Sequence, residues 1–315
     1  MRMEFFSKKR LGILLGFFLI VFLVELVLGG IIFARANSFN QRETLGFLVL
    51  GSGGSGQEAA DLTDTLILVL ANQKTGRLYF FSLPRDIWLE PLKTKINSLY
   101  HYEGFNLVRT EVSSLVGLPI EKIILVDFGS FSKIIDLAEG AEVLVDRSFD
   151  DYFYPRPGFE NNDCGGDPKL ACRYETVRFS AGWQKMSAQE ALKFSRSRHS
   201  ADPQEGTDQA RNQRQQKVML TVLRKIASPD FFLNPQKVLN LLKIFQEEIK
   251  TDLNSPDELS LIKFFLPFWG KMKMETLSLE DFFYHPKVHS SGQWVLLPVG
   301  GNWEKLQEYL GHFTT

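Results

Sequence analysis

Side chains that bind metals or act as nucleophiles are scarce in this sequence. Its 315 residues include only two cysteines and five histidines, and no histidine is close to a cysteine in the chain. A zinc site needs more of these ligands at close spacing, so none is indicated. Gly-x-Ser-x-Gly and His-Glu-x-x-His are both missing. The usual signatures of serine hydrolases and zinc peptidases are therefore excluded.

An excess of positive charge is also missing, since the formal net charge is -1. Bulk charge therefore predicts no nucleic-acid partner. No segment is repetitive, and 44% of the residues are hydrophobic, enough for a large core. The glycine-rich run at residues 51–56 lacks the Lys-Ser/Thr ending of a phosphate-binding loop and the spacing of a dinucleotide fingerprint. We interpret it as a flexible turn.

One long apolar run, at residues 11–34, is long enough to span a bilayer. Basic residues are concentrated before it, so the positive-inside rule places residues 1–10 in the cytoplasm and the rest of the chain outside the cell membrane. Its length favours an uncleaved anchor over a signal peptide. Residues 35–44 are then a juxtamembrane linker. Glu25 lies within the span, and the sequence leaves its role open.

The two cysteines, Cys164 and Cys172, lie in a loop rich in Asn, Asp, Pro and Gly. Outside the cytoplasm, a local disulfide is the better interpretation of such a pair. Closing so short a loop stabilises the fold by about 2–3 kcal/mol in a chain-entropy estimate. This disulfide is expected to fix a loop and to take no part in chemistry.

Apolar strands alternate with helical patterns along the rest of the chain. Strands are predicted at residues 45–50, 65–70, 79–82, 123–127, 141–145 and 294–299, with a hairpin turn at 72–76. Helices are predicted at residues 105–116, 130–137, 235–250, 257–271 and 303–310. This alternation predicts an α/β fold in which helices cover a mixed sheet. No linker interrupts it, so residues 45–315 are expected to be one domain.

Four arginines fall in a short polar run between residues 194 and 215. Arg196 and Arg198 are two residues apart, which predicts a strand end from which both side chains leave one face. Arg211 and Arg214 follow a Thr-Asp pair that is a good helix N-cap, and the helix is predicted to run to about residue 228.

One face of that predicted helix carries an apolar stripe, and the first two positions of the stripe are polar. The stripe, at helical spacing, consists of Arg211, Gln215, Val218, Val222 and Ile226. Arginine is rarely buried without an anionic partner, and its planar fork suits phosphate. A salt-bridged helix start is the alternative explanation.

Further polar clusters stand at predicted strand ends. They comprise Asp61 and Asp64-Thr65, then Leu83-Pro84-Arg85-Asp86, then Lys95-Ile96-Asn97. Ligands of α/β sheets gather beside strand ends, so these clusters can converge with the arginines. Each cluster is weak evidence by itself, because an Arg-Asp pair after proline is usually a turn salt bridge.

In this order, the clusters resemble the LytR-CpsA-Psr (LCP) family of envelope phosphotransferases. The matching motifs are Asp64-Thr65, Leu83-Pro84-Arg85-Asp86, Lys95-Ile96-Asn97, Arg196-Ser197-Arg198 and Asp208, Arg211 and Arg214-Gln215. The resemblance implies a single α/β/α domain behind one membrane helix. It implies that a glycopolymer phosphate moves from a polyprenyl-pyrophosphate carrier to a hydroxyl of peptidoglycan or another cell-wall glycan, with Mg²⁺ assisting.

The resemblance also implies roles for single residues. Asp64 matches a metal-binding or catalytic aspartate, and Arg85 the arginine most often tied to catalysis. Asp61 is a possible second metal ligand, because an aspartate that often follows the family's first strand is missing here. Asp86 could accept the acceptor's proton, and pairing with Arg85 is an equal alternative. The remaining residues are expected to bind the substrate: Lys95, Asn97, Arg196, Arg198, Asp208, Arg211, Arg214 and Gln215.

Two other functions stay open at this point. A non-catalytic lipid-binding or envelope-regulatory protein could use the same pocket, and a lipid-pyrophosphate hydrolase would differ only in using water as the acceptor. The presence of Asp64 and Arg85 favours an enzyme over a binding protein. Nothing in the sequence separates a transferase from a hydrolase.

Overall fold

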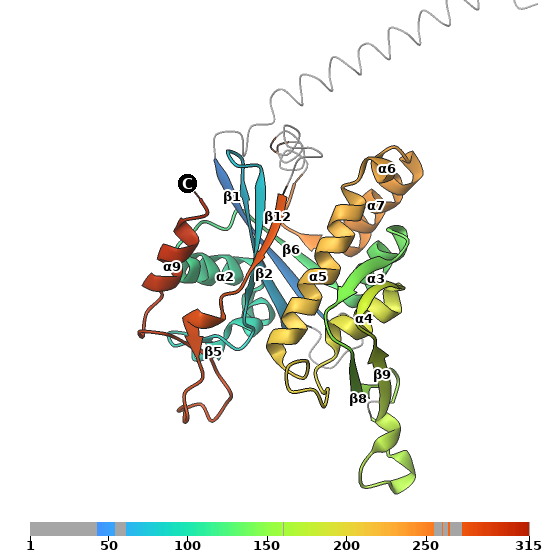
Figure 1. Cartoon of the computed structure of the whole chain (residues 1–315). Helices are drawn as coiled ribbons and strands as arrows, with labels where there is room; N and C mark the ends of the chain where they lie inside the picture. Colours follow the sequence, from blue (N-terminus) through green and yellow to red (C-terminus); the bar gives the residue numbers. More distant parts are fainter. Residues whose placement is uncertain are drawn as a thin grey trace, which may run out of the picture. The chain divides into compact units, whose positions relative to one another are not determined.

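A six-stranded mixed sheet is the centre of the structure (Figure 1). The computed structural model describes residues 43–53, 61–159, 161–254, 260, 264 and 273–314. No helix within these ranges is long and apolar enough to cross a membrane, and the anchor predicted at residues 11–34 lies outside them. The helix predicted at 257–271 is also outside them except for Ser260 and Phe264, which are helical.

The strands of the sheet follow the order β11-β6-β1-β2-β3-β12. Neighbours are antiparallel in β1–β2, β2–β3 and β6–β11 and parallel in β1–β6 and β3–β12. The mixed sheet predicted from the sequence is therefore confirmed. Its strands are β1 (Thr44–Ser52), β2 (Thr63–Asn72), β3 (Arg77–Leu83), β6 (Lys122–Asp127), β11 (Lys250–Thr251) and β12 (Lys273–Leu277).

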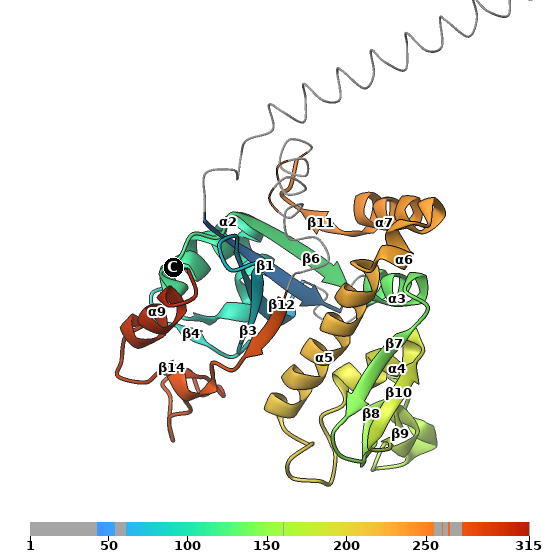
Figure 2. The same ribbon diagram turned by 45° about the horizontal axis from the view of Figure 1, so that its top comes forward.

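One face of the sheet packs against α2 (Leu99–Val116) and α9 (Glu304–Gly311) (Figures 1 and 2). Leu48, Leu68 and Phe81 are in register across β1, β2 and β3 and are fully buried in this core. Gly117 ends α2 with φ of 70°, a left-handed conformation that glycine adopts without strain. A break at Glu103–Gly104 divides α2, so its continuous part begins at residue 105, as the sequence predicts.

The opposite face of the sheet looks toward α5 (Asp208–Ile226). On this face Thr65 of β2 bonds Gln215 of α5. On its other side α5 contributes Val218 and Val222 to a second core, which two further helices and two antiparallel pairs of short strands complete. These elements are α3 (Phe128–Leu137), β7 (Ala141–Val145), β8 (Phe149–Pro155), β9 (Tyr174–Phe179), β10 (Gly182–Met186) and α4 (Ala188–Arg196). α5 thus lies between the sheet and this second core (Figure 2).

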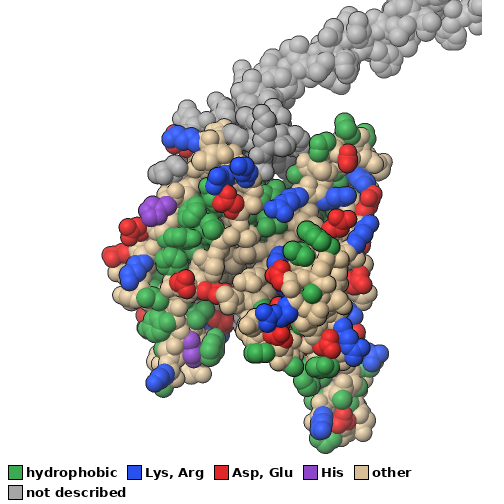
Figure 3. All heavy atoms as spheres, viewed as in Figure 1, with side chains coloured by type: hydrophobic (Ala, Val, Ile, Leu, Met, Phe, Trp, Pro, Cys, Tyr) green, Lys and Arg blue, Asp and Glu red, His purple; other side chains and the backbone are tan. Residues whose placement is uncertain are grey.

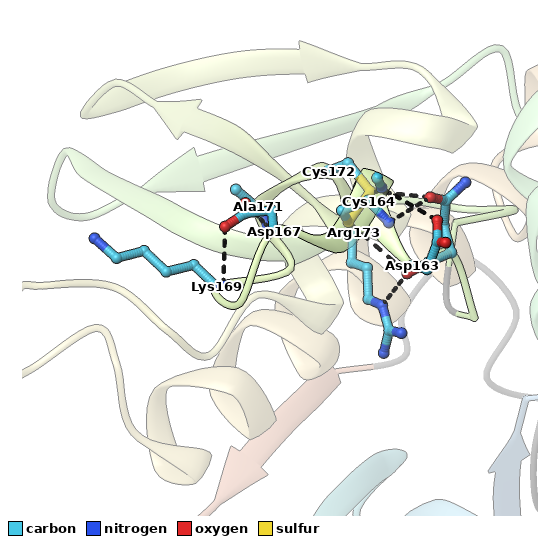
Figure 4. The surroundings of a disulfide bond; sticks show 9 residues. Asp163, Cys164, Asp167, Lys169, Ala171, Cys172 and Arg173 are labelled. Carbon is cyan, nitrogen blue, oxygen red and sulfur yellow. Dashed lines mark hydrogen bonds between the residues drawn. A yellow bond between two sulfur atoms is a disulfide. The ribbon is translucent and has the colours of Figure 1, made fainter.

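The β8–β9 pair ends in a loop that a disulfide closes (Figure 4). Cys164 and Cys172 are bonded, with their Cα atoms 5.5 Å apart. Asp167 also fixes the loop, since its carboxylate accepts from the backbone N–H groups of Lys169 and Ala171. The loop lies at the far end of the hairpin from α4 and α5 (Figure 1), consistent with a structural role for the disulfide.

The other elements are short, apart from α7. They are β4 (Trp88–Leu89), β5 (Thr94–Lys95), α6 (Pro229–Phe232), α7 (Pro235–Glu248), β13 (Phe283–Tyr284), β14 (Leu297–Pro298) and the 3-10 turns Ile96–Ser98, Cys164–Gly166, Ala171–Arg173 and Glu280–Phe282. The late strand predicted at 294–299 shrinks to β14 and an isolated bridge between Leu296 and Ile87. Trp294 is 59% exposed although the next residue, Val295, is fully buried, so only part of this apolar run lies in the core.

Candidate active site at one edge of the sheet

Four strands of the sheet have their ends close together. This end of the sheet, formed by the ends of β1, β2, β3 and β6, is called the edge below. The carboxyl ends of β1, β3 and β6 lie beside the amino end of β2, as the register of Gly51 with Thr65 and of Ser52 with Asp127 shows. Asp64 and Arg85 therefore come to the same edge, although they lie in different parts of the chain. This convergence is the arrangement that the strand-end clusters predict.

A chain of alternating charges runs along this edge. Arg85 Nη1 donates to Asp64 Oδ1 at 2.5 Å, and its Nε lies 3.5 Å from Asp86 Oδ2. Lys95 Nζ donates to the other oxygen of Asp86 at 2.6 Å. Lys95 reaches Asp86 because β4 and β5 pair Trp88 with Lys95 and fold the chain back. Two cations are thus fixed beside a carboxylate that stays partly open to solvent.

The two carboxylates of this chain differ in their surroundings. The Asp86 side chain is 14% exposed and lies between Arg85 and Lys95, whereas Asp64 is 47% exposed. Both carboxylate oxygens of Asp86 face these cations and orient them, one toward Arg85 and the other toward Lys95. The geometry therefore favours a positioning role for Asp86 over the role of general base, and leaves Asp64 as the carboxylate that faces a ligand.

Helix α5 delivers its polar first turns to the same edge. The Thr207 side chain caps the helix by accepting from the Ala210 N–H at 3.1 Å, as predicted, and Asp208 is its first residue. Gln215 Oε1 accepts from the Thr65 hydroxyl at 3.0 Å, next to Asp64. Arg211 lies one turn before Gln215, about 6 Å along the helix axis, and is only 6% exposed.

The structure corrects the strand predicted around Arg196 and Arg198. Arg196 ends helix α4, which begins with a capping box in which Ser187 and Glu190 bond each other's backbone. Helical spacing also accounts for the buried residues Ala188, Ala191 and Phe194. The two-residue spacing of the arginines was misleading because the helix ends between them, so they do not share a strand face.

Arg196 nevertheless approaches the edge, from the side of β6. Its guanidinium lies 4.3 Å from the ring centre of Phe128, the residue that follows β6 and opens α3. The buried phenol of Tyr154 lies 6.0 Å away on another side. Burial raises the pKa of Tyr154, and the charge of Arg196 opposes that rise. Tyr154 therefore stays a neutral support for Arg196 at physiological pH.

Arg214 has a structural role, and its contact with the substrate stays a prediction. Its side chain is buried, with Nε donating to the Phe194 carbonyl at 3.0 Å and Nη1 to the Glu205 carboxylate at 2.6 Å. It also donates to the carbonyls of Glu205 and Ser197. These four hydrogen bonds clamp the connection between α4 and α5. Arg214 therefore positions the residues on either side of it.

Asp151, which the sequence analysis missed, holds the segment that carries Arg198. Its buried carboxylate accepts from the Ser197 hydroxyl at 2.7 Å and from the N–H groups of Arg198 and His199, both at 3.1 Å. Burial raises the pKa of Asp151, but these hydrogen bonds and one from the Phe153 N–H outweigh burial, and the net pKa is lowered. Arg198 itself is exposed.

Replacing Asp151 is expected to destabilise the fold in a pH-dependent way. Asp151→Asn loses an anion that accepts four hydrogen bonds, so unfolding at neutral pH should need about 1–3 kcal/mol less. Because the pKa of Asp151 is lowered in the folded state, its contribution is complete above the pKa of the unfolded chain. It is lost as the pH falls through the folded value.

Denaturant unfolding of both proteins between neutral pH and about pH 3 checks this prediction. The difference in the free energy of unfolding between the wild type and Asp151→Asn should shrink as the pH falls. Asp150→Asn is the matched control, since Asp150 is the neighbouring aspartate on β8 and makes only exposed contacts, with Arg178 and Tyr152. A difference that stays constant with pH would contradict the role assigned to Asp151.

Two predicted site residues lie at the margin. Asp61 is 60% exposed and, among the residues that the structure describes, approaches His101 at 4.0 Å. Asn97 is in the turn Ile96–Ser98, where its carbonyl accepts from the Thr63 hydroxyl at 3.1 Å. Within the described part of the chain no three His, Cys, Asp or Glu side chains form a cluster that could hold a metal. A cation bound here would therefore depend on Asp64 and on oxygen atoms of the ligand.

An open cleft of about 290 Å³ adjoins the edge, between α5 and the ends of β3 and β12. Ser82, Pro84 and Thr276 line it from the sheet side, and Gln216 and Leu220 from α5. The same sheet face continues with partly exposed apolar residues on β1 and β6, Val49, Ile124 and Val126, which the register places side by side. A polar edge thus borders an apolar surface.

The positive charge at the edge is local to it. Over the face in Figure 3, Lys and Arg side chains are interspersed with Asp and Glu, in agreement with the net charge of -1. Arg211 is buried, and Arg85 and Arg196 are half-buried, so these charges interact more strongly with a ligand than charges at an open surface would. A compact anion next to an apolar group fits this environment.

Comparison with known proteins identifies the family. The sequence profile of the LytR_cpsA_psr family matches residues 32–310. The chain therefore belongs to the LytR_cpsA_psr family, as its motifs predict. The fold agrees, since the crystal structure of TagV from Bacillus subtilis superposes with a TM-score of 0.62 at 23% identity, covering 87% of this chain and 98% of that one.

Two relatives carry names that describe an activity. The chain is 22% identical to the polyisoprenyl-teichoic acid–peptidoglycan teichoic acid transferase TagU of Enterococcus faecalis, over 86% of this chain and 88% of TagU. It is 26% identical to the transferase TagV of Bacillus subtilis, over 79% of this chain. That match spans only 60% of TagV. An LCP-type transferase is the class of enzyme that these comparisons support.

Proposed function

We propose that this protein transfers a glycopolymer phosphate from a polyprenyl-pyrophosphate carrier to a hydroxyl group of a cell-wall glycan. The observation that carries the proposal is the meeting of Asp64, Arg85 and Gln215 at one edge, next to an apolar sheet face, with the buried Arg211 one helical turn before Gln215. A pyrophosphate fits the arginines, and an isoprenoid chain fits the apolar face. The names of TagU and TagV support this choice of carrier and acceptor.

The reaction is a displacement at phosphorus. The acceptor hydroxyl oxygen bonds to the phosphorus that carries the polymer, the bond to the lipid phosphate breaks, and the hydroxyl proton passes to water at the open edge. The transition state of such transfers is loose, so catalysis depends on position and on charge stabilisation. Arg85, fixed by Asp64 and Asp86, is placed to stabilise the oxygens of the transferred group.

A magnesium ion fits the edge as a partner of the substrate. Mg²⁺ is commonly held by one or two carboxylates together with substrate phosphates, and Asp64 supplies one half-exposed carboxylate. When bound, the ion would supply positive charge to the pyrophosphate. We propose Asp64 as its protein ligand in preference to Asp61, which is 60% exposed and lies 4.0 Å from His101.

Removing Asp64 should change the response to magnesium. For Asp64→Ala we expect the half-saturating Mg²⁺ concentration to rise about tenfold or more, because one carboxylate is a large part of what the protein offers the ion. Asp61→Ala is the matched control and should leave that concentration unchanged. Binding of Mn²⁺ in the presence of pyrophosphate, followed by electron paramagnetic resonance, gives a second readout. Equal effects of the two substitutions would contradict the assignment.

The location of the protein is part of the same proposal. Residues 11–34 anchor the chain in the cell membrane, residues 1–10 lie in the cytoplasm, and the catalytic domain is extracytoplasmic. The Cys164–Cys172 disulfide supports an oxidising compartment. A wall glycan and a lipid carrier are both accessible to a domain held there.

The test is release of polyprenyl phosphate by the purified full chain, with and without a glycan acceptor. A transferase releases it only when an acceptor is present. Release that is equally fast without an acceptor would identify a hydrolase. No release with any acceptor, together with tight binding of the lipid, would identify a binding protein.

A further inference from the structure

An exposed tryptophan close to the site is held in one orientation. Trp294 is 59% exposed, and its ring stacks on His285 with centroids 3.4 Å apart and planes at 18°. His285 is fixed in turn, because its Nδ1 lies 3.0 Å from the Val295 carbonyl oxygen. Single exposed apolar side chains are common in proteins. An exposed indole that is also immobilised has already lost the rotational freedom that binding would otherwise cost.

The loop that carries this stack is tied to the catalytic edge. It spans residues 285–296 between β13 and β14 (Figure 2). The Leu296 N–H donates to the Asp86 carbonyl at 2.9 Å, and the Leu296 carbonyl accepts from Trp88 at 2.9 Å. Trp294 precedes Leu296 by two residues, so its Cα lies within about 7 Å of the Leu296 Cα. The backbone at Trp294 is therefore close to the Arg85–Asp86 segment.

A second contact fixes the other part of the loop. His289 packs edge-on against the buried ring of Trp88, with centroids 4.9 Å apart. The Trp88 indole N–H donates to the Glu90 carboxylate at 2.7 Å. Loop and edge thus share Trp88 as a common support. The stack cannot move far from the edge without breaking contacts at both ends of the loop.

The position of the stack complements that of the arginines. α5 joins the edge through Thr65 on β2, whereas the loop joins it through Asp86, after β3. If the carrier pyrophosphate occupies the arginine side, the acceptor must approach Arg85 from another side. Its hydroxyl has to reach phosphorus while its sugar rings rest on nearby protein.

We propose that the Trp294–His285 stack is a platform for a sugar ring of the acceptor glycan; this inference rests on the proposed function. Pyranose rings present flat C–H faces that pack on aromatic rings, and their hydroxyl groups remain free for polar neighbours. An indole supplies a large, rigid apolar area with a polar N–H at its edge. An N-acetylated hexosamine chain fits such a platform, since it is uncharged and alternates apolar faces with polar rims.

The test compares two exposed tryptophans in the full chain, solubilised in detergent. Trp294→Ala should raise KM for the acceptor about tenfold, the size expected from losing one aromatic stacking contact. Its kcat and its KM for the lipid donor should change by less than about twofold, because among the described residues the ring of Trp294 contacts His285 and none of the arginines. Trp294→Phe keeps an aromatic face, so its KM for the acceptor should lie between that of Trp294→Ala and that of the wild type.

Trp183→Ala is the matched control. Trp183 is 75% exposed and lies on β10, opposite Leu144 of β7, with no tie to Asp86 among the described contacts. It should leave both KM values unchanged. Equal acceptor KM values in the Trp294 and Trp183 variants would overturn the proposal.

A binding measurement separates the platform from catalysis. Saturation-transfer NMR with a hexamer of β-1,4-linked N-acetylglucosamine, without lipid donor, should show contact with the wild type and with Trp183→Ala but not with Trp294→Ala. Equal contact in all three proteins would overturn the platform. If the wild type binds the hexamer but releases no polyprenyl phosphate with any acceptor, the platform is supported and the proposed function is contradicted. A Trp294→Ala protein that keeps the hexamer but loses lipid vesicles would show a membrane contact instead, against the proposal.

Discussion

Arg85→Ala should still bind the lipid carrier but transfer the polymer at least about two orders of magnitude more slowly than the wild type. A loss of this size is usual when one group that stabilises a transition state is removed. Arg85 is held by Asp64 at 2.5 Å and by Asp86 at 3.5 Å. Its guanidinium is thus oriented before the substrate arrives. A group that acts mainly in the transition state affects kcat more than ground-state affinity.

The measurement is the rate of polyprenyl phosphate release at saturating donor, together with the donor dissociation constant. Arg77→Ala is the matched control. Arg77 is the first residue of β3, so it lies at the opposite end of that strand from Arg85, and it forms an ion pair with Glu275 at 2.8 Å. Arg77→Ala should keep full activity. If Arg85→Ala weakens donor binding as much as it lowers kcat, the residue is a binding group and its catalytic assignment is wrong.

Arg211→Ala should lose about 10- to 100-fold in affinity for a pyrophosphate lipid, the range expected from removing charged hydrogen bonds. Arg211 is 6% exposed and lies one helical turn from Gln215, which bonds Thr65 beside Asp64. A charge in such a position is little screened by water. Arg211→Lys keeps the charge but not the planar fork, so its affinity for the lipid should lie between that of the wild type and that of Arg211→Ala.

Arg224→Ala is the control for this second prediction, since Arg224 is exposed in the last turn of the same helix. Thermal unfolding of each variant separates a lost ligand contact from a damaged helix. Unchanged affinity in a folded Arg211→Ala protein would remove Arg211 from the pocket and, with it, the placement of the pyrophosphate.

Local patterns in the sequence predict the central part of the fold well. The β1–β3 strands, β6, β7 and the N-cap of α5 all follow from apolar runs, turn residues and a Thr-Asp pair. The meeting of Asp64 with Arg85 also follows, because strand ends in an α/β sheet share an edge. These features depend on short-range chemistry or on a general property of sheets.

Contacts between distant segments are what the sequence does not predict. Asp151 reaches Ser197 across 46 residues, and no local pattern marks that pair. Arg214 follows Arg211 by three residues, and that spacing does not predict its contacts with Phe194 and Glu205. At Arg196 and Arg198 a two-residue spacing competed with the Ser187–Glu190 capping box, and the cap determined the structure. Capping residues upstream were the available signal.

The chemistry of transfer is tested most directly by the origin of one oxygen atom. The purified full chain is incubated with its lipid carrier and a glycan acceptor in water that carries a heavy oxygen isotope, and the products are weighed by mass spectrometry. Our account predicts equal amounts of polyprenyl phosphate and of glycan joined to polymer through a phosphodiester, with no heavy oxygen in that phosphate. Polymer phosphate that contains one heavy oxygen, with no modified glycan, would show that water is the acceptor and would contradict the proposed transferase.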